Sequence, residues 1–296
     1  MKAYFLLSTI IRLDAGESEI SPISFRSIIQ HQQLKIEDFW YIRNKSKIKC
    51  KKNPMATTSN FRDSIKKAKN QALVGPNVIN KALPYLGGGL VLTAVGTYGG
   101  LGMIQSNPTL FMPTFIGAII LQLVLFFVVR GIAERADNGI ALPLLTVYSL
   151  LTGYTLSGIV YVALGTNGVG INGVAIAALG CGITFVLARN VGSNLGEEDG
   201  LALAKTVQLG IIGLFIVILL QLVLSFFGVF TPSWLEIGIS GLGVFLFVGA
   251  SVVDFYILPR AYRDEQYLSA ALSMYLTYIN LFVFILRLLI AINSRD

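Results

Sequence analysis

Seven apolar segments alternate with short polar connections over residues 82–292. Each has about 20 residues or slightly more, the length that an apolar helix needs to cross the hydrocarbon core of a bilayer. They lie at 82–103, 111–130, 140–164, 170–188, 206–230, 234–258 and 267–292. The pattern therefore predicts an all-α, polytopic membrane protein with seven transmembrane helices.

The connections between these segments differ in charge. Loops 104–110, 165–169 and 231–233 contain no Lys or Arg. The alternate loops carry Arg135, then Arg189 and Lys205, then Arg260 and Arg263. Because basic loops stay on the cytoplasmic side, the pattern predicts a cytoplasmic N-terminus and a C-terminus on the opposite side, with a short tail at 293–296.

The N-terminal part is basic and polar. Residues 1–54 hold ten Lys/Arg against five Asp/Glu, and Met55 follows a lysine run. We expect either a disordered tail or an upstream extension that precedes a physiological start at Met55. Residues 55–81 place Phe61, Ile65, Ala68 and Ala72 at three- and four-residue spacing, typical of an amphipathic helix on a cytoplasmic membrane surface, with a solvated linker as the alternative.

Composition supports a membrane protein and narrows its partners. The chain is 54% hydrophobic and 13% charged, which is too apolar for one soluble core of 296 residues. The net charge is +7, but residues 1–54 account for +5 of it. A basic tail of this kind favours contact with anionic lipid headgroups over nucleic acid, so the expected partners are the lipid bilayer and other membrane proteins.

Two of the segments carry polar stripes. In 234–258, Ser240, Ser251 and Asp254 follow Glu236 at helical spacing, with Gly243 and Phe247 between them. Segment 267–292 repeats the pattern with Ser269, Ser273, Thr277, Asn280, Phe284 and Arg287. Because hydrocarbon cannot satisfy hydrogen-bonding groups, we expect both stripes to turn inward, joined by Gln122 and Gln221.

Small residues at four-residue spacing, Gly96 with Gly100 and Gly153 with Ser157, predict close helix packing.

Asp254 is the acidic residue that needs explaining. It lies about four residues from the end of its predicted span, so it is either an interfacial aspartate or part of a functional seam. In a closed, dehydrated seam its carboxyl group would be neutral, and in a hydrated one ionised, which would make it a proton-linked gate. A carboxylate is also a ligand that calcium accepts, although a single one forms only a weak cation contact.

The apolar segments lack the residues that several kinds of catalytic and metal site require. The only histidine, His31, and one of the two cysteines, Cys50, lie in the tail, while Cys181 lies in an apolar segment. Haem, zinc and Ser-His or Cys-His catalysis are therefore not expected, nor is an aspartyl protease with Asp254 alone. The acidic cluster Glu197, Glu198 and Asp199 predicts a solvated loop rather than a metal site. We expect no enzyme activity and no cofactor.

Two motifs resemble those of a known family. "LTVYSLLTGYTLSGI" (145–159) resembles the third helix, and "AALSMYLTYINLFVFILRLL" (270–289) the last helix, of the Bax inhibitor-1 (transmembrane Bax inhibitor motif) family. The resemblance covers about residues 80–292. It implies six helices around a central seventh and, for some members, a pH-sensitive calcium leak latched by two aspartates on the last two helices.

The resemblance places several residues in this latch. Asp254 matches the first aspartate, but Thr277 stands where the second is expected. Gln122 matches a polar or acidic residue of the second helix, and Arg135, with Arg130 as the alternative, matches an arginine beyond it. Asn280 and Glu236 extend the ion pathway along the stripes. Because the carboxylate pair is missing, we expect a weaker pH dependence than in members with both acids.

Two functions from different classes follow from these observations. The first is a calcium or cation leak channel, with Asp254 at the gate, Arg135 or Arg130 as its ionic partner when open, and calcium as the transported ion. The second is a non-conducting regulator that binds other membrane proteins, in a stress or cell-death pathway or with a quality-control protease. A continuous water path from Asp254 to Glu236 would favour the channel.

Overall fold

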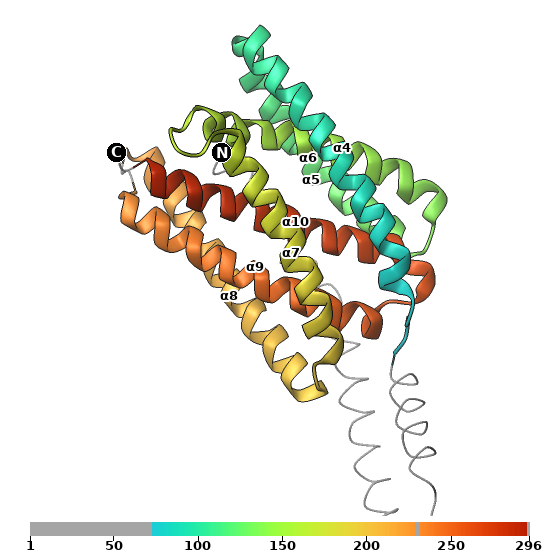
Figure 1. The fold of residues 1–296 in the computed structure, drawn as a ribbon. Helices are drawn as coiled ribbons and strands as arrows, with labels where there is room; N and C mark the ends of the chain where they lie inside the picture. Colours follow the sequence, from blue (N-terminus) through green and yellow to red (C-terminus); the bar gives the residue numbers. More distant parts are fainter. Residues whose placement is uncertain (1–72, 229–230, 295–296) are drawn as a thin grey trace, which may run out of the picture. The chain divides into compact units, whose positions relative to one another are not determined.

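The computed structural model describes residues 73–228 and 231–294. Within these ranges the chain forms seven long helices, each apolar enough to cross a membrane (Figure 1). They are α4 (Val78–Ser106), α5 (Pro108–Glu134), α6 (Asn138–Gly165), α7 (Gly170–Asn194), α8 (Glu197–Phe226), α9 (Ser233–Ala261) and α10 (Tyr267–Asn293). A 3-10 turn, η1 (Asp264–Gln266), precedes α10. The prediction of an all-α protein with seven spanning helices is confirmed.

The helices extend beyond the predicted apolar segments. The tail at 1–54 and most of the amphipathic segment lie outside the described residues, whereas residues 78–81 belong to α4. The prediction of a loop at the acidic cluster is wrong, because Glu197, Glu198 and Asp199 form the first turn of α8. Acidic side chains are favourable at a helix N-terminus, where the backbone dipole is positive, but a hydropathy pattern does not detect such a polar turn.

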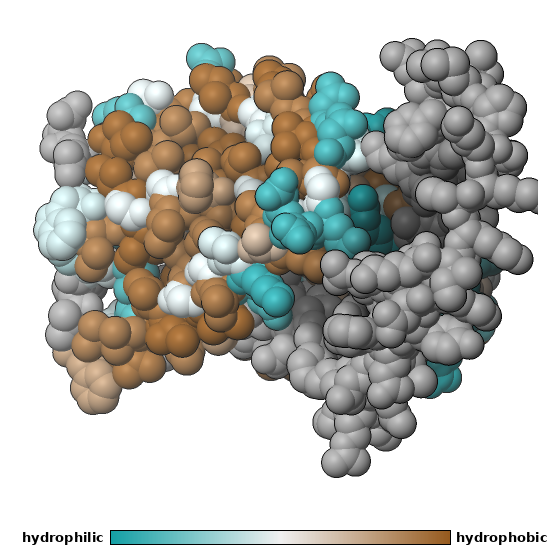
Figure 2. Space-filling view, turned by 90° about the horizontal axis from the view of Figure 1, so that it is seen from below, coloured by the Kyte–Doolittle hydropathy of each residue, from teal (hydrophilic) through white to brown (hydrophobic). Residues whose placement is uncertain are grey.

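α10 is the helix with the most extensive burial. It packs against α4, α5, α6, α7 and α9, and nearly every residue from Leu268 to Phe284 is buried. α8 packs on α9. The arrangement of six helices around a central seventh stays a prediction. Towards the outside, the helices expose large apolar side chains, and hydrophobic residues cover most of the face shown in Figure 2.

α4 and α6 form the closest helix pair. A methyl group at Gly153 would overlap the carbonyl of Thr93, and one at Gly96 would overlap the carbonyl of Leu150. The Thr97 hydroxyl donates to the Gly153 carbonyl oxygen across 3.0 Å. The small residues therefore let the two backbones approach, as their spacing predicts.

The first turn of α4 is held by η1. The backbone N–H of Asn77 donates to Asp264 Oδ1 at 2.9 Å, and Lys81 Nζ lies 3.8 Å from Asp264 Oδ2. Asp264 therefore supplies the capping oxygen that the side chain of Asn77 does not. This contact joins the start of the first span to the start of the last.

We expect Asp264→Ala to lower the free energy of unfolding by about 1 kcal/mol, the usual effect of losing a helix cap. The half-exposed Lys81 ion pair adds little to this loss. Thermal unfolding of the purified protein in detergent measures the effect. Glu265→Gln, at the exposed neighbouring position, is the control and should leave the transition unchanged. Equal transitions for both variants would contradict the capping role.

Candidate functional site: the seam between α9 and α10

The polar stripes of α9 and α10 face each other along one seam. At the end where α9 finishes and α10 begins, Thr277 Oγ1 donates to Asp254 Oδ2, and Ser273 Oγ donates to Asp254 Oδ1 across 3.2 Å. Asp254 is only 6% exposed. It lies seven residues before the end of α9, about 10 Å along the helix. Asp254 is therefore a carboxyl group buried between α9 and α10.

The Thr277 hydroxyl has two acceptors within reach. Besides Asp254, it lies 3.2 Å from the carbonyl oxygen of Ser273, one turn earlier in α10. A hydroxyl carries one proton and accepts through its lone pairs. When Asp254 is ionised, Thr277 can donate to it. When Asp254 is protonated, its O–H can donate to Thr277, which then donates to the Ser273 carbonyl. The site can satisfy both protonation states.

Aromatic side chains fill the middle of the seam. Phe247 of α9 and Phe284 of α10 are fully buried and stack with ring centroids 5.4 Å apart. Gly243 gives the Phe284 ring its space, because a methyl group there would overlap the ring. Asn280, also fully buried, lies on α10 between Thr277 and Phe284. In this conformation an apolar layer therefore separates Asp254 from the other end of the seam.

An ion pair closes that other end. Arg287 Nη2 of α10 donates to Glu236 Oε2 of α9 at 2.8 Å, and both side chains are partly buried. The two residues belong to separate polar stripes, and helical spacing alone does not predict their pairing. The seam thus has a polar site at each end and stacked rings between them.

Gln122 belongs to a different polar cluster. Its amide donates to Thr152 Oγ1 and accepts from Thr155 Oγ1, both at 3.0 Å. These contacts join α5 to α6. The amide of Gln122 therefore bonds to two threonines of α6 and not to the polar stripes of α9 and α10. Gln221 of α8 is also buried, and its amide has no hydrogen-bond partner within the described residues.

The two candidate arginines lie in different environments. Arg130 is 8% exposed and forms an ion pair with Glu134, Nε to Oε1, at 2.7 Å. Gln266 Nε2 donates to the Glu134 carbonyl oxygen at 2.7 Å, which places this end of α5 beside the start of α10. Arg135 is exposed at the end of α5. Burial therefore favours Arg130, the alternative match, over Arg135. Glu134 was not among the predicted site residues, although it lies four residues after Arg130, the spacing at which opposite charges pair along a helix.

Comparison with known proteins gives the family. The model of the family described as "Inhibitor of apoptosis-promoting Bax1" matches residues 75–295, which include all seven helices. The chain belongs to the Bax inhibitor-1 family. This membership, together with the seven apolar helices, establishes an integral multi-pass membrane protein.

Relatives of this Bax inhibitor-1 family member occur in bacteria and yeast. An uncharacterized membrane protein of Streptococcus pyogenes serotype M6 is 32% identical over 181 residues, 59% of this chain and 73% of the relative. An uncharacterized protein of Deinococcus radiodurans is 28% identical over 72% of this chain and 88% of its own length. The protein named Bax inhibitor 1 of Schizosaccharomyces pombe is 30% identical over 40% of this chain and 48% of its own.

Proposed function

We propose that this Bax inhibitor-1 family protein is a weakly pH-dependent calcium or cation leak channel with Asp254 at its gate. The observation that carries the proposal is the buried carboxyl group of Asp254, which meets the hydroxyl groups of Ser273 and Thr277 across the α9–α10 seam. Titratable groups held in dehydrated sites between helices are typical of ion and proton pathways.

In the proposed cycle, protonation of Asp254 favours the closed seam and ionisation favours a hydrated one. Burial disfavours the charged form, whereas water entering the seam would stabilise it. The conducting state also requires the rings of Phe247 and Phe284 to separate. Because Thr277 can satisfy Asp254 in either protonation state, a change of pH shifts the equilibrium only modestly. Flux should therefore rise gradually with pH.

The open state needs partners for an ionised carboxylate. Arg130 is the better candidate because it is buried near the start of α10, whereas Arg135 is exposed. Calcium, a hard cation, would contact the Asp254 oxygens transiently as the transported ion. One carboxylate with two hydroxyl groups carries too little charge to bind calcium tightly. Weak binding suits an ion that passes through the site.

A non-conducting regulator is the second candidate. The stacked rings of Phe247 and Phe284 favour it, because they interrupt the polar seam between Asp254 and Glu236. Such a regulator would act by binding other membrane proteins and would show no flux. Both proposals include a cytoplasmic N-terminus, no enzymatic activity and no cofactor.

Calcium and proton flux from liposomes across pH 5–8 tests the channel proposal. We expect the native protein to exceed empty liposomes with a shallow pH profile. Thr277→Asp restores a carboxylate pair, in which the two groups share a proton, so we expect the pH midpoint of flux to rise by about one unit. Thr277→Asn is the matched control, because Asn has nearly the size of Asp but no charge.

Each outcome separates the alternatives. A native protein that is folded yet gives no flux above empty liposomes would remove the channel and leave the regulator. Unchanged flux and pH midpoint in Thr277→Asp would instead argue against a latch at position 277.

A further inference from the structure

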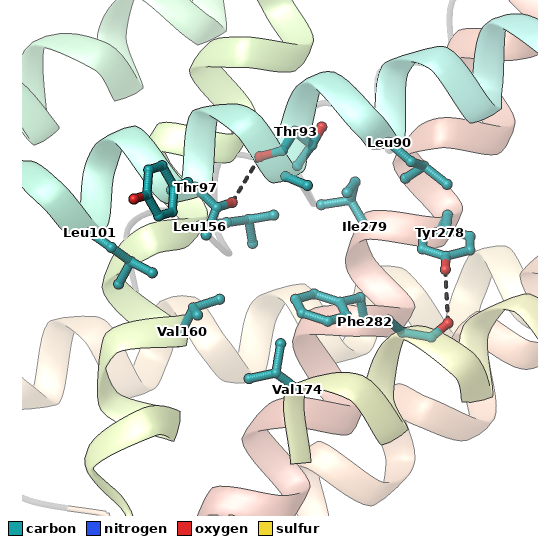
Figure 3. A pocket seen from close by; sticks show the side chains of 13 residues that line it. Leu90, Thr93, Thr97, Leu101, Leu156, Val160, Val174, Tyr278, Ile279 and Phe282 are labelled. Atoms are coloured by element: carbon teal, nitrogen blue, oxygen red, sulfur yellow. Dashed lines mark hydrogen bonds between the residues drawn. The ribbon is translucent and has the colours of Figure 1, made fainter. Parts of the chain in front are cut away.

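A lateral groove lies outside the seam, on the other side of α10. It has a volume of about 380 Å³ and is lined by residues of α4, α6, α7 and α10. Figure 3 shows Leu101, Val160, Val174 and Phe282 pointing into one shared space from these four helices. The lining residues of α6 and α10 are buried except for Tyr278, which is partly buried, whereas those of α4 and α7 are mostly part-exposed or exposed. The groove therefore opens between α4 and α7, with α6 and α10 as its floor.

Three of the four hydroxyl groups around the groove are engaged in the protein, and the fourth is that of Tyr98, a side chain that is 81% exposed. Thr93 Oγ1 bonds to the Tyr275 hydroxyl at 2.6 Å, and Thr97 Oγ1 donates to the Thr93 carbonyl at 2.9 Å. The Tyr278 hydroxyl donates to the Ala178 carbonyl at 2.8 Å (Figure 3). The rest of the lining is apolar. Because a bound water needs two to four polar partners, such a groove favours a hydrocarbon occupant over water.

The dimensions of the groove limit what can enter it. It follows α4 from Leu90 to Leu101, about 17 Å at 1.5 Å per residue. The volume divided by this length gives a mean width of about 5 Å. Because this volume is the space open to atom centres, the width limits where the atoms of an occupant can lie. The carbon atoms of one extended chain fit within it, whereas the side-chain atoms on the two sides of a helix, which is about 10 Å across, do not.

We propose that this groove is a binding site for one acyl chain of a bilayer phospholipid. The lining positions lie within the spanning helices, so its mouth faces the hydrocarbon of the membrane. Arg189 of α7 donates to Asn80 of α4 at 3.0 Å, which ties the two walls together at one end. The site does not depend on conduction through the seam. A chain in the groove would touch three helices besides α4 and exchange more slowly than lipid on an open helix face.

A photoreactive phospholipid with a diazirine on its acyl chain tests the site. The native protein is reconstituted in phosphatidylcholine liposomes, illuminated and mapped by mass spectrometry. We expect labelling of Leu90, Val174 and Phe282 to exceed, several times over, labelling of Leu209 and Ile216, which are exposed on α8. Ala94→Trp, which fills the groove, should abolish this excess, whereas Val95→Trp, on the adjacent exposed position outside it, should retain it.

Three results would overturn the proposal. The first is equal labelling of the groove and α8 in the native protein. The second is an excess that survives in a folded Ala94→Trp variant. The third is labelling of the groove by a photoreactive free fatty acid but not by the phospholipid. The comparison of the groove with α8 needs only the native protein, so the proposal can be tested even if Ala94→Trp does not fold.

Discussion

Replacing Asp254 with Asn is expected to lower calcium flux at pH 8 by about tenfold, because a charged group contributes about 1.5–3 kcal/mol through its hydrogen bonds and 1.4 kcal/mol is a factor of ten. The carboxamide has nearly the shape of the carboxyl group but cannot ionise. Its single oxygen can accept from Ser273, and its NH2 group can donate to the Thr277 hydroxyl, which then donates to the Ser273 carbonyl oxygen, so the closed seam should be retained. The hydrated state would lose the charge that stabilises it.

The pH profile separates this gate from a merely structural role. In the native protein, flux is expected to rise gradually with pH. The Asp254→Asn variant should show no such rise between pH 5 and pH 8, and its flux should stay below that of the native protein throughout. A residue that only held the helices together would change the amount of flux but not its dependence on pH.

Asp199→Asn is the matched control for this measurement. Asp199 lies exposed in the first turn of α8, away from the seam, so its loss should leave both flux and pH profile unchanged. All three proteins are compared after confirming equal elution and equal thermal unfolding. A folded Asp254→Asn variant with the native profile would exclude Asp254 as the gate.

The seam shows what the sequence could predict and why. Spacing alone placed Asp254, Ser251 and Ser240 on one helix face and Thr277 with Ser273 on another, because a helix brings residues three and four apart together. The cost of polar groups in hydrocarbon then predicted that these faces turn inward. The structure places Asp254 against Ser273 and Thr277 as expected.

Other features depended on contacts that spacing does not encode. The sequence showed Phe247 and Phe284 but not that their rings stack across the seam, since this depends on how α9 and α10 align. Gln122 was expected at the stripes, yet Thr152 and Thr155 satisfy its amide on α6. The groove combines residues from four helices, so no one segment of sequence carries its signature.

Gly153→Ala is expected to produce the largest loss of stability. The added methyl group would overlap the backbone carbonyl of Thr93, and a backbone cannot move aside as a flexible side chain can. α4 and α6 would have to separate, which also weakens the bond from Thr97 to the Gly153 carbonyl. Overpacking of this kind costs about 1–3 kcal/mol, and we expect the upper part of that range.

Thermal unfolding in detergent measures this loss, and Gly158→Ala in the same helix is its control. A methyl group at Gly158 would meet only the Phe115 ring, at an ordinary contact distance of 3.6 Å. That variant should be neutral or slightly stabilising, because Ala is favoured over Gly in a helix by up to about 1 kcal/mol. Gly153→Ala should instead lower Tm by about 5–10 °C. If Gly153→Ala proved as stable as Gly158→Ala, α4 and α6 would not pack as closely as the structure places them. The pair carries four of the Leu and Val side chains that line the groove, Leu90, Leu101, Leu156 and Val160, so its separation should also alter the lipid site.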